Sequence, residues 1–543
     1  MPQLDRRKLV GRRAAAAVLA GVALGLSWQP FGWWPLLAVS IPAFTLTVRN
    51  QPLRRAFGLG YLFGLGMLAV AVSWVHVLGL WVAALLIVFE ALFFGILGVL
   101  LSLVSRLRWW PVAAAAAWVL VEYAYARIPF GGFGWIRLAY AAVDTPLSGF
   151  LPVIGVAGLS FVVALVGQII AWCASALWSM RTEPSGLPRR ARGFLLAAIA
   201  LVALVAIPAG LRLYQVEPQQ TAAGHVEVGI VQGNIPGRGI EAMGRARSVT
   251  NNHLSETVNL ITKVRLGQQR QPDFLLWPEN STDIDPTVDP ITRLTVEAAA
   301  QVAGRPILVG AVMQGPGEDE RQTTALWWVP GRGPQARYDK QNLVPFGEWI
   351  PFRDQLKPLF PVLERVGAQS VPGTEPGVLT VDLGDRIVRL GDVICFELAY
   401  DQTVYGAVRG GAQVLLVQSN NATYGGTGQI EQQFAITRAR AMEARREIAV
   451  ATTNSVSGFI DRDGRVMYRT SEFTADSLVV SMPLRSAITP ALIVAPWLER
   501  GLAVLALVAG AMAAVAARRS NRPTGELVLP TDSQTPSGVD VVR

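Results

Sequence analysis

Three residues of this sequence could together carry out covalent catalysis: Glu279, Lys340 and Cys395, each placed where a predicted strand ends. A cysteine that forms an acyl intermediate must become a thiolate, and a free thiol is mostly protonated at neutral pH. The Glu279 carboxylate can accept the thiol proton, and the Lys340 ammonium can stabilise the thiolate and then a tetrahedral oxyanion. None of the three histidines stands in a motif that could replace them. The set is sufficient for acyl transfer if the fold brings it together.

Each of these residues, taken alone, has a more ordinary interpretation. A glutamate after Trp-Pro is most often a surface or capping carboxylate, and a lysine in a loop is usually solvated. A cysteine that ends an apolar strand is usually a small buried hydrophobe. The occurrence of all three in one region, each after a strand, is what favours catalysis.

Residues 224–485 predict the α/β domain that must position these side chains. Short β-branched and apolar segments alternate there with helical patterns, which is typical of α/β folds. We expect strands at 225–233, 273–279, 305–312, 325–330, 388–397, 413–420 and 447–454, and helices near 243–266, 290–303, 400–410 and 429–446. Functional groups collect at strand ends in such folds, in agreement with the positions of the three residues.

These segments resemble the catalytic motifs of the nitrilase superfamily. The resemblance rests on Trp277-Pro278-Glu279-Asn280, Tyr338-Asp339-Lys340, Gly391-Asp392-Val393-Ile394-Cys395-Phe396-Glu397, Val231-Gln232-Gly233-Asn234 and Asn454-Ser455. It implies a four-layer αββα sandwich. It also implies that Glu279 is the general base, that Lys340 stabilises the thiolate and the oxyanion, and that Cys395 is the nucleophile.

The composition of the chain indicates a membrane protein. Hydrophobic residues make up 51% of the 543 residues and charged residues 16%, whereas a soluble globular chain carries about 25% charge. Apolar runs occur near 14–28, 34–48, 56–79, 80–104, 109–124, 156–180, 194–213 and 498–517. Several of them are shorter than the roughly 20 residues that a membrane span needs, so their bounds are approximate, and the run at 80–104 is the clearest. The basic residues behind the net charge of +9 lie between these runs, so we expect no nucleic-acid partner.

The same basic residues predict the orientation in the membrane. Every second connection is rich in Arg and Lys, namely those within 6–13, 49–55, 106–108, 181–192 and 518–522. By the positive-inside rule these connections are cytoplasmic. We therefore predict seven transmembrane helices in residues 1–215, an extracytoplasmic catalytic domain at 216–490, an eighth transmembrane helix at 491–520 and a disordered cytoplasmic tail at 521–543. A cleaved signal peptide is the alternative for the N-terminus, but no small-x-small cleavage site follows the first run.

Few other side chains suggest a special site. Cys173 lies in an apolar run and Cys395 in the α/β region, so we expect no disulfide between them, and no zinc-ligand spacing exists. No cofactor or metal is expected. Glu90, Glu122 and Arg137 lie in or near predicted spans, where a charged group is costly unless it is paired or faces a cavity.

Spans combined with nitrilase-like motifs are similar to the membrane-embedded apolipoprotein N-acyltransferase family. The similarity extends to the segments at 29–35, 133–138, 158–160 and 343–348. That family moves an acyl chain from a membrane phospholipid, through a cysteine thioester, to the α-amino group of the diacylglyceryl-cysteine of an apolipoprotein. The resemblance thus implies a phospholipid donor, a diacylglyceryl-modified apolipoprotein acceptor and contact with membrane lipids. It also implies a location in the bacterial inner or plasma membrane, with the catalytic domain on the periplasmic, extracytoplasmic side.

The resemblance also suggests supporting residues. Glu348 and Glu397 match two further acidic positions, which implies that Glu348 assists proton transfer or positions Lys340 and that Glu397 orients the loop of Cys395. Ordinary ion pairing is the alternative for both. The backbone N–H of Phe396 is a candidate second oxyanion donor. Phe396 stands where a tyrosine is common in the family, and the segment after 232–236 lacks an expected tryptophan.

Two segments could cover the site. Residues 351–372 are candidates for a mobile apolar lid, and the alternative is a packed insertion. Its apolar positions are Leu356, Leu359, Phe360, Val362, Leu363 and Val366. The second segment is the glycine-rich stretch at 424–428.

Two other functions use the same residues differently. A membrane-tethered amidase or nitrilase would hydrolyse a C–N bond with the same triad, although a simple hydrolase needs only one anchor. A transporter or scaffold with a degenerate nitrilase domain would have no reason to retain Glu279, Lys340 and Cys395, and no inverted repeat is evident.

Overall fold

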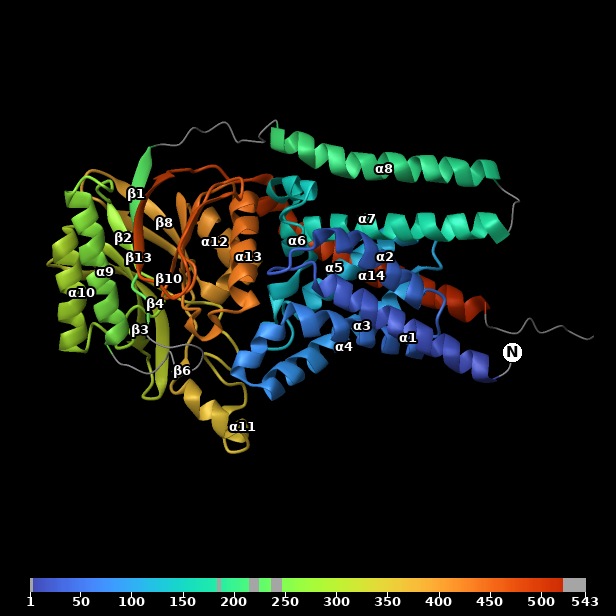
Figure 1. The fold of residues 1–543 in the computed structure, drawn as a ribbon, viewed down its shortest axis with the longest axis horizontal. Helices are drawn as coiled ribbons and strands as arrows, with labels where there is room; N and C mark the ends of the chain where they lie inside the picture. Colours follow the sequence, from blue (N-terminus) through green and yellow to red (C-terminus); the bar gives the residue numbers. More distant parts are fainter. Residues whose placement is uncertain (1–2, 183–186, 214–223, 236–246, 521–543) are drawn as a thin grey trace, which may run out of the picture.

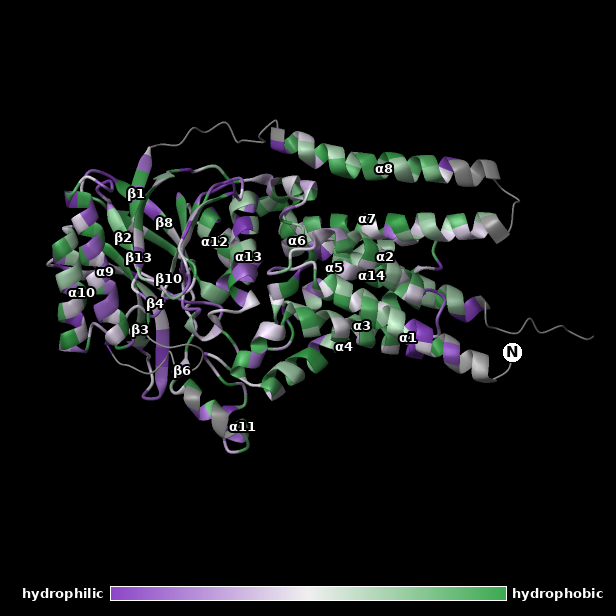
Figure 2. Ribbon diagram, viewed as in Figure 1, coloured by the Kyte–Doolittle hydropathy of each residue, from purple (hydrophilic) through white to green (hydrophobic). Residues whose placement is uncertain are grey.

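The chain folds into a bundle of helices and an α/β domain that lie end to end (Figure 1). The computed structural model describes residues 3–182, 187–213, 224–235 and 247–520. The tail predicted at 521–543 lies outside these residues, as does most of the segment expected to carry a tryptophan. Hydrophobic residues dominate the bundle, whereas hydrophilic residues gather on the α/β domain (Figure 2).

Eight helices of the described residues correspond to the eight predicted apolar runs. They are α1 (Gln3–Gly25), α2 (Leu37–Val48), α3 (Leu53–Ala71), α4 (Leu80–Val104), α5 (Trp110–Tyr125), α7 (Leu151–Thr182), α8 (Leu187–Leu213) and α14 (Pro490–Ser520). Five of them, α3, α4, α7, α8 and α14, are long and apolar enough to cross a membrane. The first half of helix α1 contains several basic residues, and α2 and α5 have only 12 and 16 residues, yet all three pack in the same bundle. The count of eight spans stays a prediction.

Among the differences between the helix bounds and the predicted runs, two involve a break in the helix. The run at 56–79 divides, because α3 ends at Ala71 and the 3-10 helix η2 (Ser73–Leu78) follows. Helix α7 begins at Leu151 and breaks at Gly155, where φ is 69°. A Cβ atom at Gly155 would lie 2.6 Å from Ala495 Cβ and 2.8 Å from Glu443 Oε1. Glycine therefore permits both the left-handed backbone and the close approach of α7 to its neighbours.

Two sheets form the centre of the α/β domain. The first has the order β13 (Asp476–Pro483), β1 (His225–Gln232), β2 (Phe274–Leu276), β3 (Ile307–Gln314), β4 (Glu320–Val329) and β5 (Gly333–Asp339), with β6 (Gln369–Ser370) paired to β4. The second has the order β12 (Val466–Arg469), β11 (Gly458–Ile460), β10 (Ile448–Thr452), β9 (Val414–Ser419), β8 (Ile387–Ile394) and β7 (Val378–Asp382). Val228, Leu308, Leu390 and Leu416 belong to the apolar core between the two sheets.

Helices cover the outer face of each sheet. Helices α9 (Ser248–Arg265) and α10 (Pro290–Ala303) pack on the first sheet, and α12 (Asp401–Arg409) and α13 (Gly428–Ala444) lie between the second sheet and the bundle (Figure 1). The domain is thus the four-layer αββα sandwich that the resemblance implied. All seven expected strands are present, with bounds shifted by a few residues, and the expected helices correspond to α9, α10, α12 and α13.

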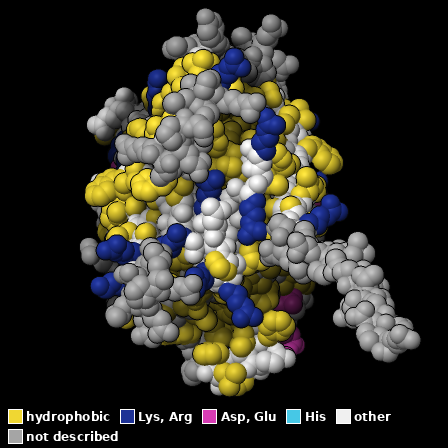
Figure 3. Space-filling model, turned by 90° about the vertical axis from the view of Figure 1, so that its right-hand side faces the viewer, with side chains coloured by type: hydrophobic (Ala, Val, Ile, Leu, Met, Phe, Trp, Pro, Cys, Tyr) yellow, Lys and Arg dark blue, Asp and Glu magenta, His cyan; other side chains and the backbone are white. Residues whose placement is uncertain are grey.

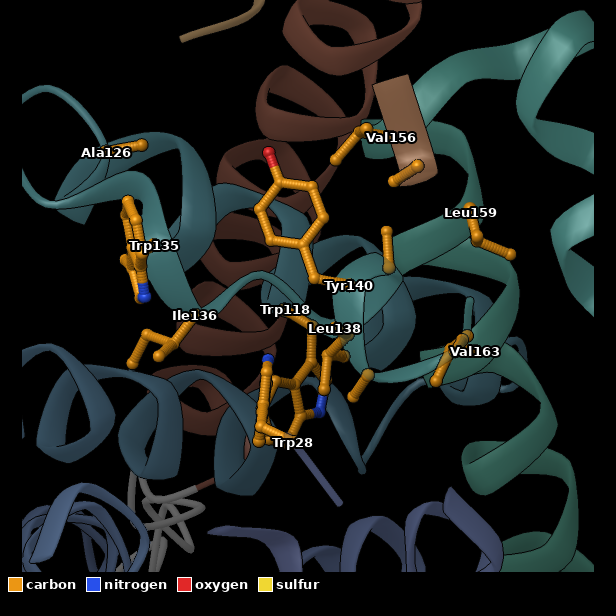
Figure 4. Close-up of a cluster of buried hydrophobic side chains, with 14 of the residues drawn as sticks. Trp28, Trp118, Ala126, Trp135, Ile136, Leu138, Tyr140, Val156, Leu159 and Val163 are labelled. Carbon is orange, nitrogen blue, oxygen red and sulfur yellow. The ribbon is translucent and has the colours of Figure 1, made fainter. Parts of the chain in front are cut away.

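The bundle and the sandwich share one apolar core. The cluster that contains Trp118 and Leu138 of the bundle also contains Tyr405 of α12 and Ile436 of α13. Figure 4 shows part of this cluster, where Trp28, Trp118, Ile136 and Leu138 gather beneath Tyr140. The helices of the fourth layer are therefore buried on both sides, and the two parts of the chain form one body at their junction.

A network of buried charges crosses this junction. The Arg137 guanidinium lies 3.4 Å from Glu122, 2.8 Å from Asp401 of α12 and 2.9 Å from Glu499 of α14. Arg440 of α13 contacts Asp401 at 2.7 Å. Because buried charges must be compensated by partners, the pairing of Arg137 with Glu122 meets the expectation for polar groups near the spans. Glu90 is also buried within the bundle.

Candidate active site

Glu279 and Lys340 meet at the centre of the predicted site. Lys340 Nζ lies 2.9 Å from Glu279 Oε1 and 3.0 Å from Glu348 Oε1. Lys340 is 1% exposed and Glu279 is 4% exposed. An ammonium held between two carboxylates away from water is ordered, and its charge acts strongly on neighbouring groups.

The turn after β2 places Glu279. Trp277 N donates to Leu308 O at 2.9 Å, which keeps the segment beside β3. A Cβ atom at Gly310 would lie 2.2 Å from Pro278 O, so only glycine allows the Glu279 turn to approach β3 so closely. Asn420 N donates to Glu279 Oε2 at 2.8 Å and leaves Oε1 directed at the lysine.

Lys340 is held by its backbone as well as by its ion pairs. It follows directly on β5, and its N–H donates to Thr323 O at 2.9 Å. Its carbonyl oxygen accepts a hydrogen bond from Gly373 N at 2.8 Å. These two hydrogen bonds fix the backbone at Lys340, whose side chain reaches Glu279.

Cys395 stands at the bend between β8 and the short 3-10 helix η7 (Cys395–Ala399). Its φ of 54° lies in the left-handed region, which is unusual for a residue other than glycine and is often found at functional sites. The side chain is half-buried, and Sγ lies 3.8 Å from Asn421 Oδ1. The bend turns the thiol out of the strand toward the end of β9.

The charges of the site act on one another. Burial and the negative charge of Glu279 raise the pKa of the Cys395 thiol, and Lys340 opposes this effect. Burial also raises the pKa of Glu279, although the Lys340 ammonium lowers it in part. Burial alone would lower the pKa of Lys340, but Glu279 and Glu348 raise it well above its usual value. The resting site thus holds a neutral thiol beside a charged lysine and a carboxylate suited to accept a proton.

Glu397 connects the loop of the nucleophile to the loop of the lysine. Its Oε2 accepts a hydrogen bond from Ile394 N at 2.9 Å, and its Oε1 accepts from Gln341 N at 2.7 Å and Asn342 N at 3.1 Å. Tyr338 Oη donates to both oxygens at 2.9 Å. No hydrogen bond to a lysine or arginine is found for this carboxylate within the described part of the chain. This geometry fits the predicted orienting role, which stays a prediction.

Glu348 faces Lys340 and is held by the loop that leads from Lys340 to it. Val344 N donates to Glu348 Oε2 at 2.8 Å, and Thr323 Oγ1 donates to Oε1 at 3.3 Å. Its side chain is 14% exposed, so the contact with Lys340 is not a solvated surface pair. The arrangement suits a group that positions the ammonium.

The ring of Phe396, next to the nucleophile, contacts aromatic residues of the bundle. Its ring stacks on Trp135 with centroids 5.9 Å apart and on Phe133 with centroids 6.2 Å apart. Tyr400 packs edge-on against it at 5.3 Å. The bundle therefore forms one side of the site directly beside the nucleophile, and the role of the Phe396 N–H stays a prediction.

The first candidate lid is partly packed and partly exposed. It contains helix α11 (Arg353–Leu356) and the 3-10 helix η6 (Pro361–Val366). Leu363 and Val366 form a small core with Ile350, while Leu359 is 68% exposed. The Phe360 ring stacks on Trp81 at the start of α4 at 5.8 Å. The side chain of Val362 lies outside the description.

The second candidate lid, at 424–428, packs against neighbouring residues. Tyr424 packs edge-on against Trp74 at 5.2 Å, and Thr427 caps α13. A Cβ atom at Gly425 would lie 2.7 Å from Phe473 Cζ. Movement of either segment stays a prediction.

Sequence reasoning missed several residues of the site. Asn420, Asn421 and Tyr338 contact Glu279, Cys395 and Glu397, respectively. Asn420 and Asn421 follow β9, which pairs in parallel with β8, so their place at the same sheet edge was the available signal. Among the described residues, no group of histidine, cysteine, aspartate and glutamate is arranged to hold a metal ion.

Known proteins resemble both parts of the chain. Residues 20–169 match the family described as apolipoprotein N-acyltransferase N-terminal domain, and residues 292–489 match the carbon-nitrogen hydrolase family. An apolipoprotein N-acyltransferase of Mycolicibacterium smegmatis is 35% identical over 88% of this chain and 81% of its own length. One of Vibrio cholerae is 27% identical over 88% of this chain and 92% of its own length. A solved amidase from Nesterenkonia AN1, of the nitrilase superfamily, shares 16% identity with a TM-score of 0.37, over 52% of this chain and 99% of its own.

Proposed function

This chain belongs to the apolipoprotein N-acyltransferase family, and from this membership we infer that it transfers an acyl chain from a membrane phospholipid to the α-amino group of the diacylglyceryl-cysteine that begins an apolipoprotein. The observation that carries the assignment of residues is the buried contact of Lys340 with Glu279 and Glu348, whose charges all act on the Cys395 thiol. Cys395 is the nucleophile, Glu279 the general base and Lys340 the oxyanion stabiliser.

The first half-reaction forms the thioester. The Cys395 thiol gives its proton to Glu279 as the sulfur attacks the carbonyl carbon of the phospholipid ester. Lys340 and the Phe396 N–H stabilise the oxyanion of the tetrahedral intermediate. The carbon–oxygen bond to glycerol then breaks, and the leaving alkoxide takes the proton from Glu279. A lysophospholipid departs, and the acyl chain remains on sulfur.

The second half-reaction returns the thiol. The α-amino group of the acceptor attacks the thioester carbonyl, and Glu279 accepts a proton from the nitrogen. The carbon–sulfur bond breaks as an amide forms, and the proton returns to sulfur. Water would attack the same thioester, so a productive site must exclude it.

The catalytic domain lies on the extracytoplasmic side of the bacterial inner membrane in this proposal. The proposal is supported by the charge at the end of the bundle away from the sandwich. Lys and Arg side chains gather there, with few Asp or Glu (Figure 3). They include Arg12, Arg13, Arg54, Arg55, Arg106, Arg108, Arg518 and Arg519. Basic ends of spans are typical of the cytoplasmic side. Both lipid substrates would then reach the site from the outer leaflet.

Intact-mass spectrometry of the purified chain after incubation with phospholipid tests the proposal. Wild type should gain the mass of one acyl chain, and hydroxylamine should remove it. Cys395→Ala should gain none. Addition of a synthetic diacylglyceryl-cysteinyl peptide should then release the adduct as an amide. No adduct on folded wild type, or release only as free fatty acid in the presence of the peptide, would contradict acyl transfer and favour hydrolysis.

A further inference from the structure

Gln432 of α13 ties three segments of the bundle to the catalytic domain. Its Oε1 accepts hydrogen bonds from Trp74 Nε1 and Trp135 Nε1, both at 2.9 Å. Its Nε2 donates to Gln29 O and Ala71 O, both at 2.7 Å. Gln432 is 4% exposed. An amide group has two donor hydrogens and two acceptor lone pairs, so every hydrogen-bonding position of this side chain is used.

The pattern of bonds fixes the orientation of the amide. An indole N–H can only donate, and a backbone carbonyl can only accept. Rotation of the Gln432 amide by half a turn would set donors against both tryptophans and acceptors against both carbonyls. By contrast, Trp28 Nε1 and Trp118 Nε1 are buried in the same bundle without a hydrogen-bond partner in the described structure. Trp74 and Trp135 are therefore held by hydrogen bonds, whereas Trp28 and Trp118 are held by packing.

Both tryptophans contact residues that lie close to the nucleophile. Trp135 stacks on Phe396, the residue after Cys395, with an interplanar angle of 17°. Trp74 packs against Tyr424 of the 3-10 helix η8 (Ala422–Tyr424), which begins next to Asn421, whose Oδ1 lies 3.8 Å from Cys395 Sγ. The two rings also contact each other at 6.0 Å. Together Trp74, Trp135 and Phe396 form an aromatic wall beside the thiol.

We propose that Gln432 is a positioning residue that holds this aromatic wall in place and thereby directs the acyl-enzyme toward the amine acceptor rather than water. The proposal rests on the function inferred above. Gln432 does not touch the reacting atoms and acts through Trp74 and Trp135. Without its acceptor oxygen the two indole N–H groups lose their partner, the rings turn to find another, and the side of the thioester that they cover opens to water.

The test separates the fate of the acyl-enzyme from its formation. Full-length wild type and variants are acylated with vesicles of phosphatidylethanolamine and phosphatidylglycerol that carry a radiolabelled acyl chain. The isolated acyl-enzyme is then mixed with a synthetic diacylglyceryl-cysteinyl peptide, and the ratio of labelled amide to free fatty acid is measured. Gln432→Leu should still form the thioester. A misplacement of about 1 Å at a reacting group can cost about 100-fold in rate. Because Gln432 acts only through Trp74 and Trp135, we expect a smaller effect, a fall in this ratio of about tenfold.

Two further variants separate positioning from general stability. Gln432→Glu keeps an acceptor oxygen for both indoles, so it should restore most of the ratio even if the protein unfolds more easily. Gln168→Leu removes a buried amide of α7 that donates to Thr45 Oγ1 at 3.0 Å, and it should leave the ratio at the wild-type value. If Gln432→Leu fails to fold, Trp135→Phe removes the N–H and keeps a ring on Phe396, with a change expected in the same direction.

The outcomes distinguish this proposal from the one beneath it. An unchanged ratio in a folded Gln432→Leu or Trp135→Phe variant overturns the positioning role while the function stands. An equal fall in Gln168→Leu also overturns it, because the effect would then follow stability alone. Wild type that forms no thioester at all refutes the proposed function itself.

Discussion

Replacement of Glu397 by glutamine is a sharp test of how the site is held together. The substitution keeps size and shape but removes the charge and turns one oxygen into a donor. In the wild type, four donors converge on the carboxylate: Ile394 N, Gln341 N, Asn342 N and Tyr338 Oη. A glutamine oxygen in the Oε1 position keeps the two bonds to the lysine loop, and the NH2 group then faces Ile394 N, which is also a donor.

The cost follows from this count. A hydrogen bond to a charged acceptor contributes about 1.5–3 kcal/mol, and an unpaired buried donor costs a similar amount. Tyr338 can rotate its hydroxyl and accept from the new NH2 group, so the lost contact is chiefly the one to Ile394. We expect the free energy of unfolding to fall by roughly 2–3 kcal/mol. Because Ile394 N anchors the bend at Cys395, the rate of thioester formation should fall by about 100-fold.

The assay pairs stability with single-turnover acylation. The denaturation midpoint is followed in detergent, and thioester formation is followed by intact mass over time. Glu447→Gln is the control. Glu447 is also a buried carboxylate, and it pairs with Arg485 at 2.9 Å rather than with any residue of the site. The control should lose stability but not rate. Burial raises the pKa of Glu397, while its N–H donors lower it. The expected losses require the ionised form. Full stability and full rate in Glu397→Gln would mean that the carboxyl is already neutral, which would refute the reasoning.

Three other outcomes follow from the same geometry. Lys340→Met leaves two buried carboxylates without their cation, so the free energy of unfolding should fall by about 3–5 kcal/mol. The variant should form no thioester, and a stable variant that still acylates would contradict the assignment. The rate of thioester formation should rise with pH through the pKa of Glu279, which burial raises above the ordinary 4.5, because only the ionised carboxylate accepts the thiol proton; a profile flat on the acid side would exclude Glu279 as the base. Phe360→Ala removes the ring stacked on Trp81, a contact of about 0.5–1.5 kcal/mol, and should speed proteolysis between 353 and 366; equal cleavage of wild type would show that the segment is not docked there.

Burial decides which strands the sequence could reveal. Strands β1, β3 and β9 are buried almost throughout and read as apolar runs, so they were predicted. Strands β5, β6, β7, β11, β12 and β13 were not predicted, and four of them, β5, β7, β12 and β13, are the edge strands of the two sheets. In β5, exposed and buried positions mix within GPQARYD, which gives little apolar signal. Edge strands often carry polar or charged side chains, and the short apolar runs that remain in them give a weak strand signal.

The parts of the site differ in the same way. Glu279, Lys340 and Cys395 could be found because each stands in a recognisable motif, although β5, the strand before Lys340, was not predicted. Gln432 and Trp74 could not, because 358 residues separate them and neither stands in a motif that the sequence makes visible. The contacts of the bundle with the nucleophile loop depend on how two layers pack, and spacing along the chain carries no information on that packing.

The charge network at the junction has a consequence for the order of synthesis. Glu499 lies 362 residues after Arg137, its partner. At a translation rate of about 5–20 residues per second, roughly 20–70 s pass between the two. During that interval Arg137 has Glu122 nearby, and it gains Asp401 only when the sandwich has formed. The network closes when the last helix, α14, joins the bundle. A chain released before α14 is made would therefore keep Arg137 beside Glu122 and Asp401 but leave both Arg137 and Arg127 without Glu499, so the junction becomes fully charge-paired only in the complete molecule.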